Sequence, residues 1–232
     1  MTASRTARER VRAELTREIT DIARRQLASH GADGLSLRAV AREMGMVSSA
    51  IYRYFATKDD LLTALIIDGY NALGAAVEQA DAAFTGGSHL ERWLTVCRAV
   101  RTWALAHPHE YALLYGSPVP GYQAPAETVA ARLRDVTVYS KVIRDAYADG
   151  AITDPPGAPA VPAELSAEAP GLKELMHGVP DPVVLRALSV WTGLFGWVNF
   201  ELFGQFNNTI EDRTAAFDHS MRTQAWMLGL NT

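Results

Sequence analysis

Apolar residues recur every three or four positions along most of this chain, which is the spacing of an amphipathic α-helix. These stripes predict helices and one helical turn over about residues 8–29, 37–44, 48–54, 58–80, 89–107, 110–115, 126–148, 182–206 and 210–228. No segment alternates apolar and polar residues as a half-buried strand does, and no internal repeat is present. The pattern therefore predicts an all-α protein.

Two of the predicted helices are short and lie close together in the chain. Ser36 is a suitable N-cap for the first, and Gly45 permits the positive φ of a tight turn after it. Ala41, Gly45 and Ile51 have the small–glycine–aliphatic spacing of a helix-turn-helix, in which the small residue allows close approach and the aliphatic residue closes the core. This spacing alone is a weak signal, because any helical hairpin can contain it.

The stronger signal is the segment that follows, Ile51-Tyr-Arg-Tyr-Phe-Ala-Thr-Lys-Asp-Asp-Leu-Leu62. It resembles the Tyr-x-Tyr-Phe-x-x-Lys-x-x-Leu signature that ends the DNA-binding segment of the tetracycline-repressor (TetR) family of transcription regulators. The resemblance extends over about residues 15–65. It implies an N-terminal three-helix, homeodomain-like helix-turn-helix domain over residues 1–58 and a C-terminal helical ligand-binding and dimerisation domain over residues 59–232.

The second helix of the helix-turn-helix carries small polar residues that a DNA major groove would meet first. Hydroxyl groups there donate to base edges or phosphates, and an alanine methyl group packs against thymine. The resemblance further implies that two tyrosine hydroxyls and a lysine contact backbone phosphates, and two arginines are candidates for phosphate or base contacts. The predicted DNA-binding residues are Ser36, Arg38, Ser48, Ser49, Ala50, Tyr52, Arg53, Tyr54 and Lys58. The alternative is a serine pair that only caps the helix.

Charge is distributed unevenly along the chain. The formal net charge is −4, yet residues 1–58 hold 11 Lys and Arg against 6 Asp and Glu, whereas residues 59–232 hold 11 against 20. The basic excess therefore lies on the predicted helix-turn-helix, as binding to phosphate requires.

Few features of the sequence indicate where in the cell the protein is located. A single cysteine, Cys97, cannot form an internal disulfide, which suits a reducing cytoplasm. No uninterrupted apolar run of about 18 residues is present, so we expect no membrane span. The N-terminus has no apolar segment typical of a secretory signal.

No catalytic or metal-binding set stands out, so we expect neither an enzyme nor a cofactor. The six histidines form no helical pair with metal-ligand spacing. Aromatic residues are concentrated in the second part of the chain, where they either fill a core and a dimer interface or frame a pocket for a small, largely apolar effector. The candidate ligand-binding residues are Trp93, Cys97, Trp103, Tyr111, Tyr115, Tyr139, Trp191, Phe195 and Asn199. For Cys97, a small core residue is the stronger interpretation.

Residues 191–196 also resemble the Trp-x-x-Leu-x-Gly segment of one C-terminal subgroup of the TetR family. Phe195 stands where that subgroup has a histidine, so no role of the histidine is transferred. The prolines at 150–182, 7 of the 11 in the chain, predict a mobile connection over about residues 150–181 with one helical turn near 172–177.

The last two predicted helices hold more apolar residues than one core needs, and the first of them is predicted to contain Gly193, Gly196 and Gly204. Close packing against a second copy would explain both features. The sequence thus predicts a homodimeric TetR-type regulator, a repressor that leaves a pseudo-palindromic operator on binding a small effector. The alternative is a helical small-molecule-binding protein without DNA-reading activity.

Overall fold

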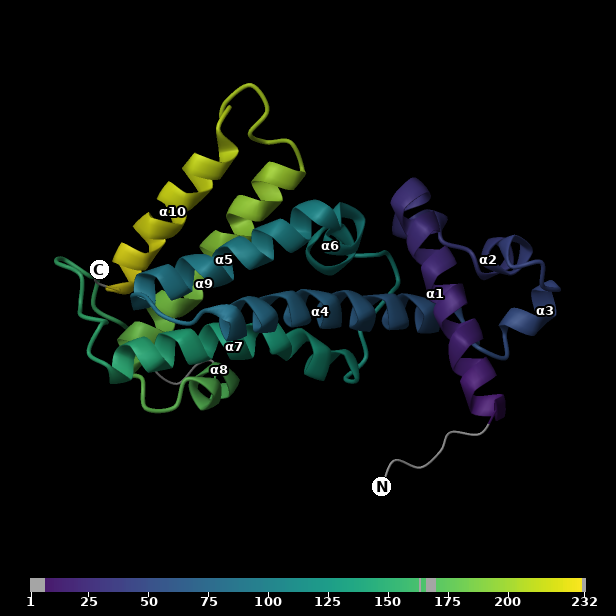
Figure 1. Ribbon diagram of the computed structural model, residues 1–232, viewed down its shortest axis with the longest axis horizontal. Helices are drawn as coiled ribbons and strands as arrows, with labels where there is room; N and C mark the ends of the chain where they lie inside the picture. The colour runs from purple at the N-terminus through teal and green to yellow at the C-terminus, as the bar shows by residue number, and fades with distance from the viewer. Residues whose placement is uncertain (1–6, 163, 166–169, 231–232) are drawn as a thin grey trace. The chain divides into compact units, whose positions relative to one another are not determined.

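The computed structural model describes residues 7–162, 164–165 and 170–230 (Figure 1). Within them the chain is all-α, as predicted, and the β-structure is one isolated bridge between Ile152 and Leu230. The helices are α1 (Ala7–Gly34), α2 (Leu37–Glu43), α3 (Ser48–Ile51), α4 (Lys58–Ala83), α5 (His89–Ala106), α6 (Pro108–Tyr115), α7 (Thr128–Ala148), α8 (Pro170–Leu175), α9 (Asp181–Leu202) and α10 (Arg213–Leu228).

The chain forms two compact units. The N-terminal unit comprises Met1–Asn71 and His107–Ala131, and the C-terminal unit comprises Ala72–Ala106 and Arg132–Thr232. Helix α4 contributes to both units, and α6 belongs to the N-terminal unit.

One apolar core holds the N-terminal unit together. It contains the buried residues Ile19, Ile22, Ala23, Leu35, Leu37, Val40, Ala41, Ile51, Phe55, Leu61, Leu62 and Leu65. These residues come from α1 to α4, so the four helices fix one another, and α2 and α3 lie beside α1 (Figure 1). Regular helix α1 is interrupted at Gly31, whose φ of 69° is non-helical, two residues after the predicted end of this helix at about residue 29.

The helix-turn-helix follows from its local sequence. The Ser36 hydroxyl accepts from the Ala39 amide at 3.5 Å and caps α2, and Gly45 has a φ of 67° in the turn. Helix α3 is shorter than predicted, because it comprises Ser48–Ile51 rather than residues 48–54. The next residues form turns, in which the Arg53 amide donates to the Ala50 carbonyl at 3.2 Å.

The start of α4 is defined by reciprocal capping. The Asp60 amide donates to the Thr57 hydroxyl at 3.1 Å, and the Thr57 amide donates to the Asp60 carboxylate at 2.9 Å. This arrangement positions Lys58 as the first residue of the helix.

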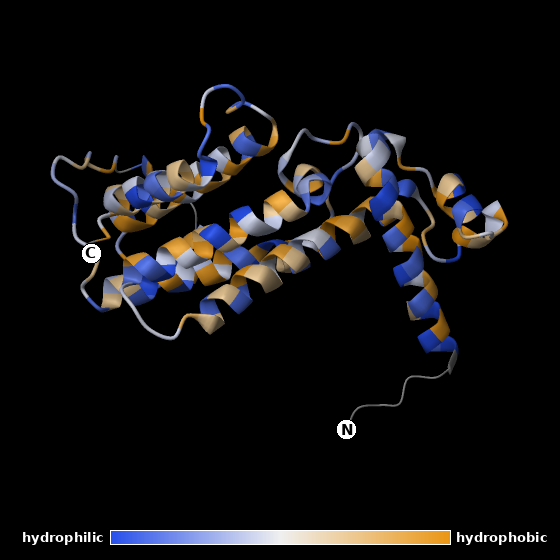
Figure 2. Ribbon diagram, turned by 45° about the horizontal axis from the view of Figure 1, so that its top comes forward, coloured by the Kyte–Doolittle hydropathy of each residue, from blue (hydrophilic) through white to orange (hydrophobic). Residues whose placement is uncertain are grey.

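In the C-terminal unit, α5, α9 and α10 pack on one another. Figure 2 shows apolar and polar residues interleaved along these helices, as expected of amphipathic helices. Trp93, Leu94, Leu194, Phe217 and Met221 are fully buried between them. Burial of Phe217 and Met221 shows that these residues belong to the core of a single chain.

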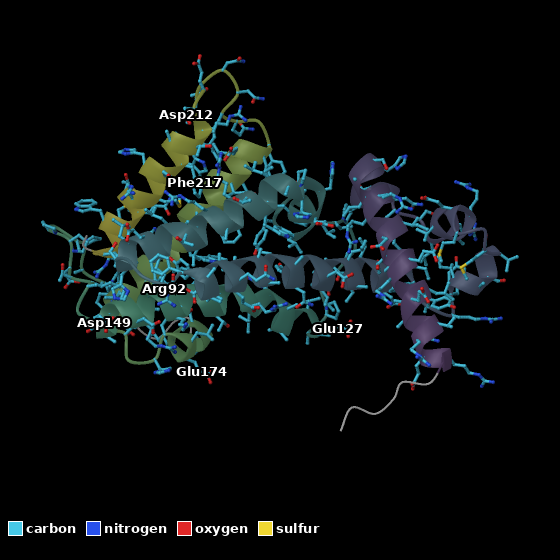
Figure 3. The ribbon with its side chains drawn as sticks, in the orientation of Figure 1. Arg92, Glu127, Asp149, Glu174, Asp212 and Phe217 are labelled. Carbon is cyan, nitrogen blue, oxygen red and sulfur yellow. The ribbon has the colours of Figure 1, made fainter. Side chains whose placement is uncertain are left out.

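The turn between α9 and α10 corrects a prediction. Helix α9 ends at Leu202 rather than residue 206, and Gly204 lies beyond it with a φ of 79°. Gly193 does lie in α9, where an added Cβ would be 2.9 Å from the Gln224 amide group, whereas Gly196 has open space at that position. Helix α10 starts after Asp212, whose carboxylate accepts from the Ala215 amide at 2.9 Å (Figure 3).

The connection before α9 contains packed residues in its described part. Ile152 and Met176 are buried, and α8 begins two residues before the predicted turn. Residues 163 and 166–169 lie outside the described residues. The mobility expected from the prolines stays a prediction.

Helices α4 and α9 are each long enough to cross a bilayer, and each contains an 18-residue window that is sufficiently apolar. Half of the α4 window and 39% of the α9 window are buried inside the protein. Core packing explains both helices, so they give no reason to place the chain in a membrane.

Candidate nucleic-acid interface

Helix α3 is anchored from one side and open on the other. Ile51 is fully buried, and Met46 packs partly against the core of the N-terminal unit. Ser48 and Ser49 are exposed, and Ala50 is half-buried. The predicted reading residues therefore lie on the outer side of the helix-turn-helix, with the two hydroxyl groups accessible.

The two tyrosines have different surroundings. Tyr52 is exposed, whereas Tyr54 is half-buried and packs against the core. The Arg12 guanidinium lies 5.5 Å from the centre of the Tyr54 ring and donates to the Arg53 carbonyl at 2.9 Å. This cation–π contact and hydrogen bond tie α1 to the turn that carries both tyrosines.

Two other predicted contacts have structural roles in the free protein. The Lys58 ammonium donates to the Asp33 carbonyl at 3.1 Å, and the Ser36 hydroxyl caps α2. A phosphate would compete for the ammonium, and the Ser36 hydroxyl retains its proton to donate.

The cations of the helix-turn-helix are available to a polyanion. Arg38, Arg42 and Arg53 are exposed and have no carboxylate within 4 Å among the described residues. On α1, by contrast, Arg25 is paired with Glu43 at 2.9 Å. Arg38 and Arg53 are the two arginines predicted as phosphate or base contacts, and that role stays a prediction. Arg42 is exposed in the same way.

The sequence did not point to Arg12 or Val47. Arg12 reads as one of several solvated arginines on α1, and nothing in its spacing indicates the contact with Tyr54. A valine after the turn is expected in the core, yet Val47 is exposed. Only three-dimensional packing identifies these two residues.

Several candidate ligand-binding residues have their polar groups engaged already. Trp93, Cys97 and Tyr139 are buried. The Trp93 indole donates to the Met221 carbonyl at 3.1 Å, and the Tyr139 hydroxyl donates to the Ala187 carbonyl at 2.8 Å. Burial raises the pKa of the Cys97 thiol, which keeps it protonated and supports its interpretation as a core residue.

Other candidates form aromatic pairs. The Trp191 and Phe195 rings lie 5.0 Å apart in the C-terminal unit, where Trp103 is also buried. Tyr111 and Tyr115 lie on α6 in the N-terminal unit, with ring centres 5.1 Å apart. Burial raises the pKa of Tyr111. Each unit thus contains one of these two pairs.

In the second half of α9, two buried polar side-chain atoms have no hydrogen-bond partner among the described residues. They are the Asn199 side-chain carbonyl oxygen and the Trp197 indole nitrogen. A ligand could satisfy both, since buried polar groups in proteins are nearly always hydrogen-bonded. Among the described residues, no group of three or more His, Cys, Asp or Glu side chains is placed to hold a metal ion.

Two sequence profiles match the chain. One, described as bacterial regulatory proteins of the tetR family, matches residues 19–65, and another, described as tetracyclin repressor-like C-terminal domain, matches residues 93–224. The HTH-type transcriptional regulators Rv1816 of Mycobacterium tuberculosis and Mb1846 of Mycobacterium bovis are each 39% identical over 224 residues, which cover 94% of this chain and 92% of each relative.

Solved structures agree. The crystal structure of the regulatory protein SCO4313 has a TM-score of 0.75 and 34% identity, covering 94% of this chain and 98% of its own. A protein structure from Rhodococcus sp. RHA1 has a TM-score of 0.67 and 27% identity, covering 90% and 94%. The alternative without DNA-reading activity has no such support. The chain belongs to the TetR family, and it is a DNA-binding transcriptional regulator, not an enzyme.

Proposed function

We propose that this regulator is a cytoplasmic repressor that binds a pseudo-palindromic operator as a homodimer and is released by a small, largely apolar effector. Proteins of the TetR family bind DNA operators and small-molecule effectors and are dimeric. The observation that carries the proposal is the outer side of the helix-turn-helix, where Ser48 and Ser49 are exposed and three arginines have no carboxylate partner among the described residues.

Operator binding would use α3 in the major groove. Ser48, Ser49 and Ala50 would meet base edges, while Tyr52 and Lys58 would meet phosphates. Successive major grooves on one face of DNA are separated by about 34–36 Å, so two copies bind together only if their reading helices have that spacing.

A set of exposed apolar residues on α9, on α10 and on the turn after α9, called the apolar face below, supports the proposed dimer. The exposed large apolar residues of these helices and of the turn after α9 are Leu188, Phe200, Phe203, Trp226 and Met227. Burial of this face against a second copy would form a four-helix bundle. Most other apolar residues of the two helices are used inside one chain, so the face is smaller than the sequence suggested.

The effector would occupy the aromatic C-terminal unit or contact α6. Asn199 and Trp197 would supply polar contacts, because their buried polar atoms have no hydrogen-bond partner in the described part of the chain. Arg24 on α1 pairs with Glu110 on α6 at 2.6 Å, so a ligand that displaced Tyr111 or Tyr115 would act on a helix tied to the DNA-binding domain. Such a ligand shifts the population away from the DNA-binding spacing.

The decisive experiment has two steps. The duplex that the protein binds is first selected from random DNA, and transcription in vitro is then measured from a promoter that contains this duplex. We expect the protein to lower transcript yield, and we expect some members of a graded series of fatty acids and alcohols to restore it. An increase in transcript on adding protein alone would identify an activator and refute repression. Operator binding unchanged by every member of the series would refute the apolar effector.

A further inference from the structure

Val47 is the most exposed large apolar residue that the structure describes, with 72% of its surface accessible. It immediately precedes α3, with φ −64° and ψ 137°. Single exposed apolar residues are common on protein surfaces and need no explanation by themselves. The position of Val47, at the start of the reading helix, is what makes it informative.

The local backbone directs this side chain outward. Gly45 reverses the chain with a φ of 67°, and the Met46 amide donates to the Ala41 carbonyl at 2.9 Å. Met46 packs partly against the core. Because the backbone is extended at Val47, its side chain points away from the core that holds Met46.

Stability of the free protein does not account for a valine here. The residue before a helix is favourable when its side-chain oxygen accepts a backbone amide, as Ser36 does for α2 and Asp212 does for α10. Val47 provides no such oxygen, and α3 has no side-chain cap. The side chain also buries little apolar surface, so it gains little from the hydrophobic effect.

We propose that Val47 contacts the C5-methyl group of a thymine in each half-site and thereby determines sequence specificity. The thymine methyl is the apolar group that a base pair presents in the major groove. Val47 adjoins Ser48 and Ser49, so it would add an apolar contact next to two polar ones. This inference rests on the proposed placement of α3 in the major groove.

The test removes the methyl group from DNA and the isopropyl group from the protein. Each thymine of the duplex selected by the wild-type protein is replaced, one position at a time in both half-sites, by deoxyuridine, which lacks only the methyl group. Dissociation constants are measured by fluorescence anisotropy. At one position, wild-type affinity should fall about fourfold per half-site, which is the value expected for one buried methyl group.

In Val47→Ala, replacing the thymine at that position by deoxyuridine should no longer lower the affinity. The effects of deoxyuridine at other positions should stay as in the wild type. Val11→Ala is the matched control, because Val11 is an exposed valine on α1 of the same unit, and it should retain the wild-type profile. Val47→Ser should abolish the thymine effect while its melting temperature stays at or above that of the wild type, since serine supplies the missing cap.

Two results would overturn the inference while leaving operator binding intact. One is an unchanged deoxyuridine effect in Val47→Ala, and the other is a wild-type protein that is insensitive to removal of every thymine methyl. A wild-type protein that enriches no sequence would overturn the proposed function as well, so the two failures are distinguishable.

Discussion

The C-terminal unit and the helix-turn-helix of this regulator use arginine in opposite ways. In the C-terminal unit, four arginines each bind both oxygens of one carboxylate: Arg92 with Asp81, Arg98 with Asp218, Arg101 with Glu201 and Arg134 with Glu78. Arg92, labelled in Figure 3, also donates to Asp145 at 2.8 Å. On the helix-turn-helix, Arg38, Arg42 and Arg53 have no carboxylate within 4 Å among the described residues.

The difference shows that charge alone does not identify a DNA-binding surface. A guanidinium held by both oxygens of a carboxylate is fixed and neutralised, and it lowers the pKa of that carboxyl, as Arg92 does for Asp81. An unpaired guanidinium on an exposed helix remains available to phosphate. Whether an arginine has a carboxylate partner therefore distinguishes arginines that stabilise the fold from those that are available to bind DNA.

The largest expected effect concerns the apolar face of the C-terminal unit. Phe200→Glu and Trp226→Glu each place a charge on exposed apolar surface and should yield folded monomers in analytical ultracentrifugation. Loss of the second half-site contact should weaken operator binding by about 10²–10⁴-fold.

Val129→Glu is the control for this prediction, because Val129 is an exposed valine on α7, outside these two helices. It should remain a dimer. Met221→Glu is unsuitable as a test, because Met221 is fully buried and the charge would unfold the core. Intact dimers in both α9 and α10 variants would contradict the proposed bundle.

The second prediction concerns the removal of an arginine that forms an ion pair with a buried carboxylate. Arg101→Ala leaves the Glu201 carboxylate, whose side chain is 4% exposed, without its partner. Removal of one member of a buried pair costs about 3–5 kcal/mol, which urea unfolding would measure. The double variant Arg101→Leu, Glu201→Leu should recover much of this loss, and equal losses in both variants would show that packing rather than charge is responsible.

The third prediction concerns the buried carboxyl of Asp135, which has no ion-pair partner among the described residues. Burial raises its pKa from 3.8 to about 6. The folded state therefore binds the proton more tightly than the unfolded state, so this group stabilises the fold below about pH 4 and loses that contribution as the pH rises through 6.

Asp135→Asn should accordingly be more stable than the wild type at pH 7.5, by about 1–3 kcal/mol. The difference should shrink at pH 4.5, and urea unfolding at the two pH values would measure it. An equal difference at both values would show that Asp135 is charged in the folded protein.

Much of the fold of the helix-turn-helix could be predicted from the sequence, because short-range rules determine its form. Ser36 caps a helix, and Gly45 and Ile51 fix a turn and its core, all within one hairpin. The predicted length of α3 was wrong, because the backbone forms turns after Ile51. The spacing of apolar residues does not distinguish such turns from a continuing helix. Val47 was missed since the pattern cannot distinguish an apolar residue in a core from one on a surface.

The C-terminal unit was predicted only as a set of helices. Apolar stripes place helices, but they do not say which residues one chain buries and which it leaves exposed. Met221 and Phe217 lie in the core, whereas Trp226, five residues after Met221, is exposed. The candidate ligand residues Trp93 and Tyr139 bond to backbone carbonyls from distant helices, contacts that sequence spacing does not encode.

The smallest expected effect compares an unpaired arginine with a paired one. Arg53→Ala should leave the free energy of unfolding within about 0.5 kcal/mol of the wild type, because the Arg53 side chain has no carboxylate partner in the part of the chain that the structure describes. It should lower operator affinity and reduce the slope of log K against log salt by about 1, the value for one lost phosphate contact. Arg98→Ala, in contrast, removes the exposed pair with Asp218, so it should cost less than about 1 kcal/mol of stability and leave the salt slope unchanged. Titrations at several salt concentrations, combined with urea unfolding of both variants, would measure the contrast. An unchanged slope in Arg53→Ala would remove Arg53 from the phosphate contacts, and a reduced slope in Arg98→Ala would show that pairing with a carboxylate does not exclude an arginine from DNA binding.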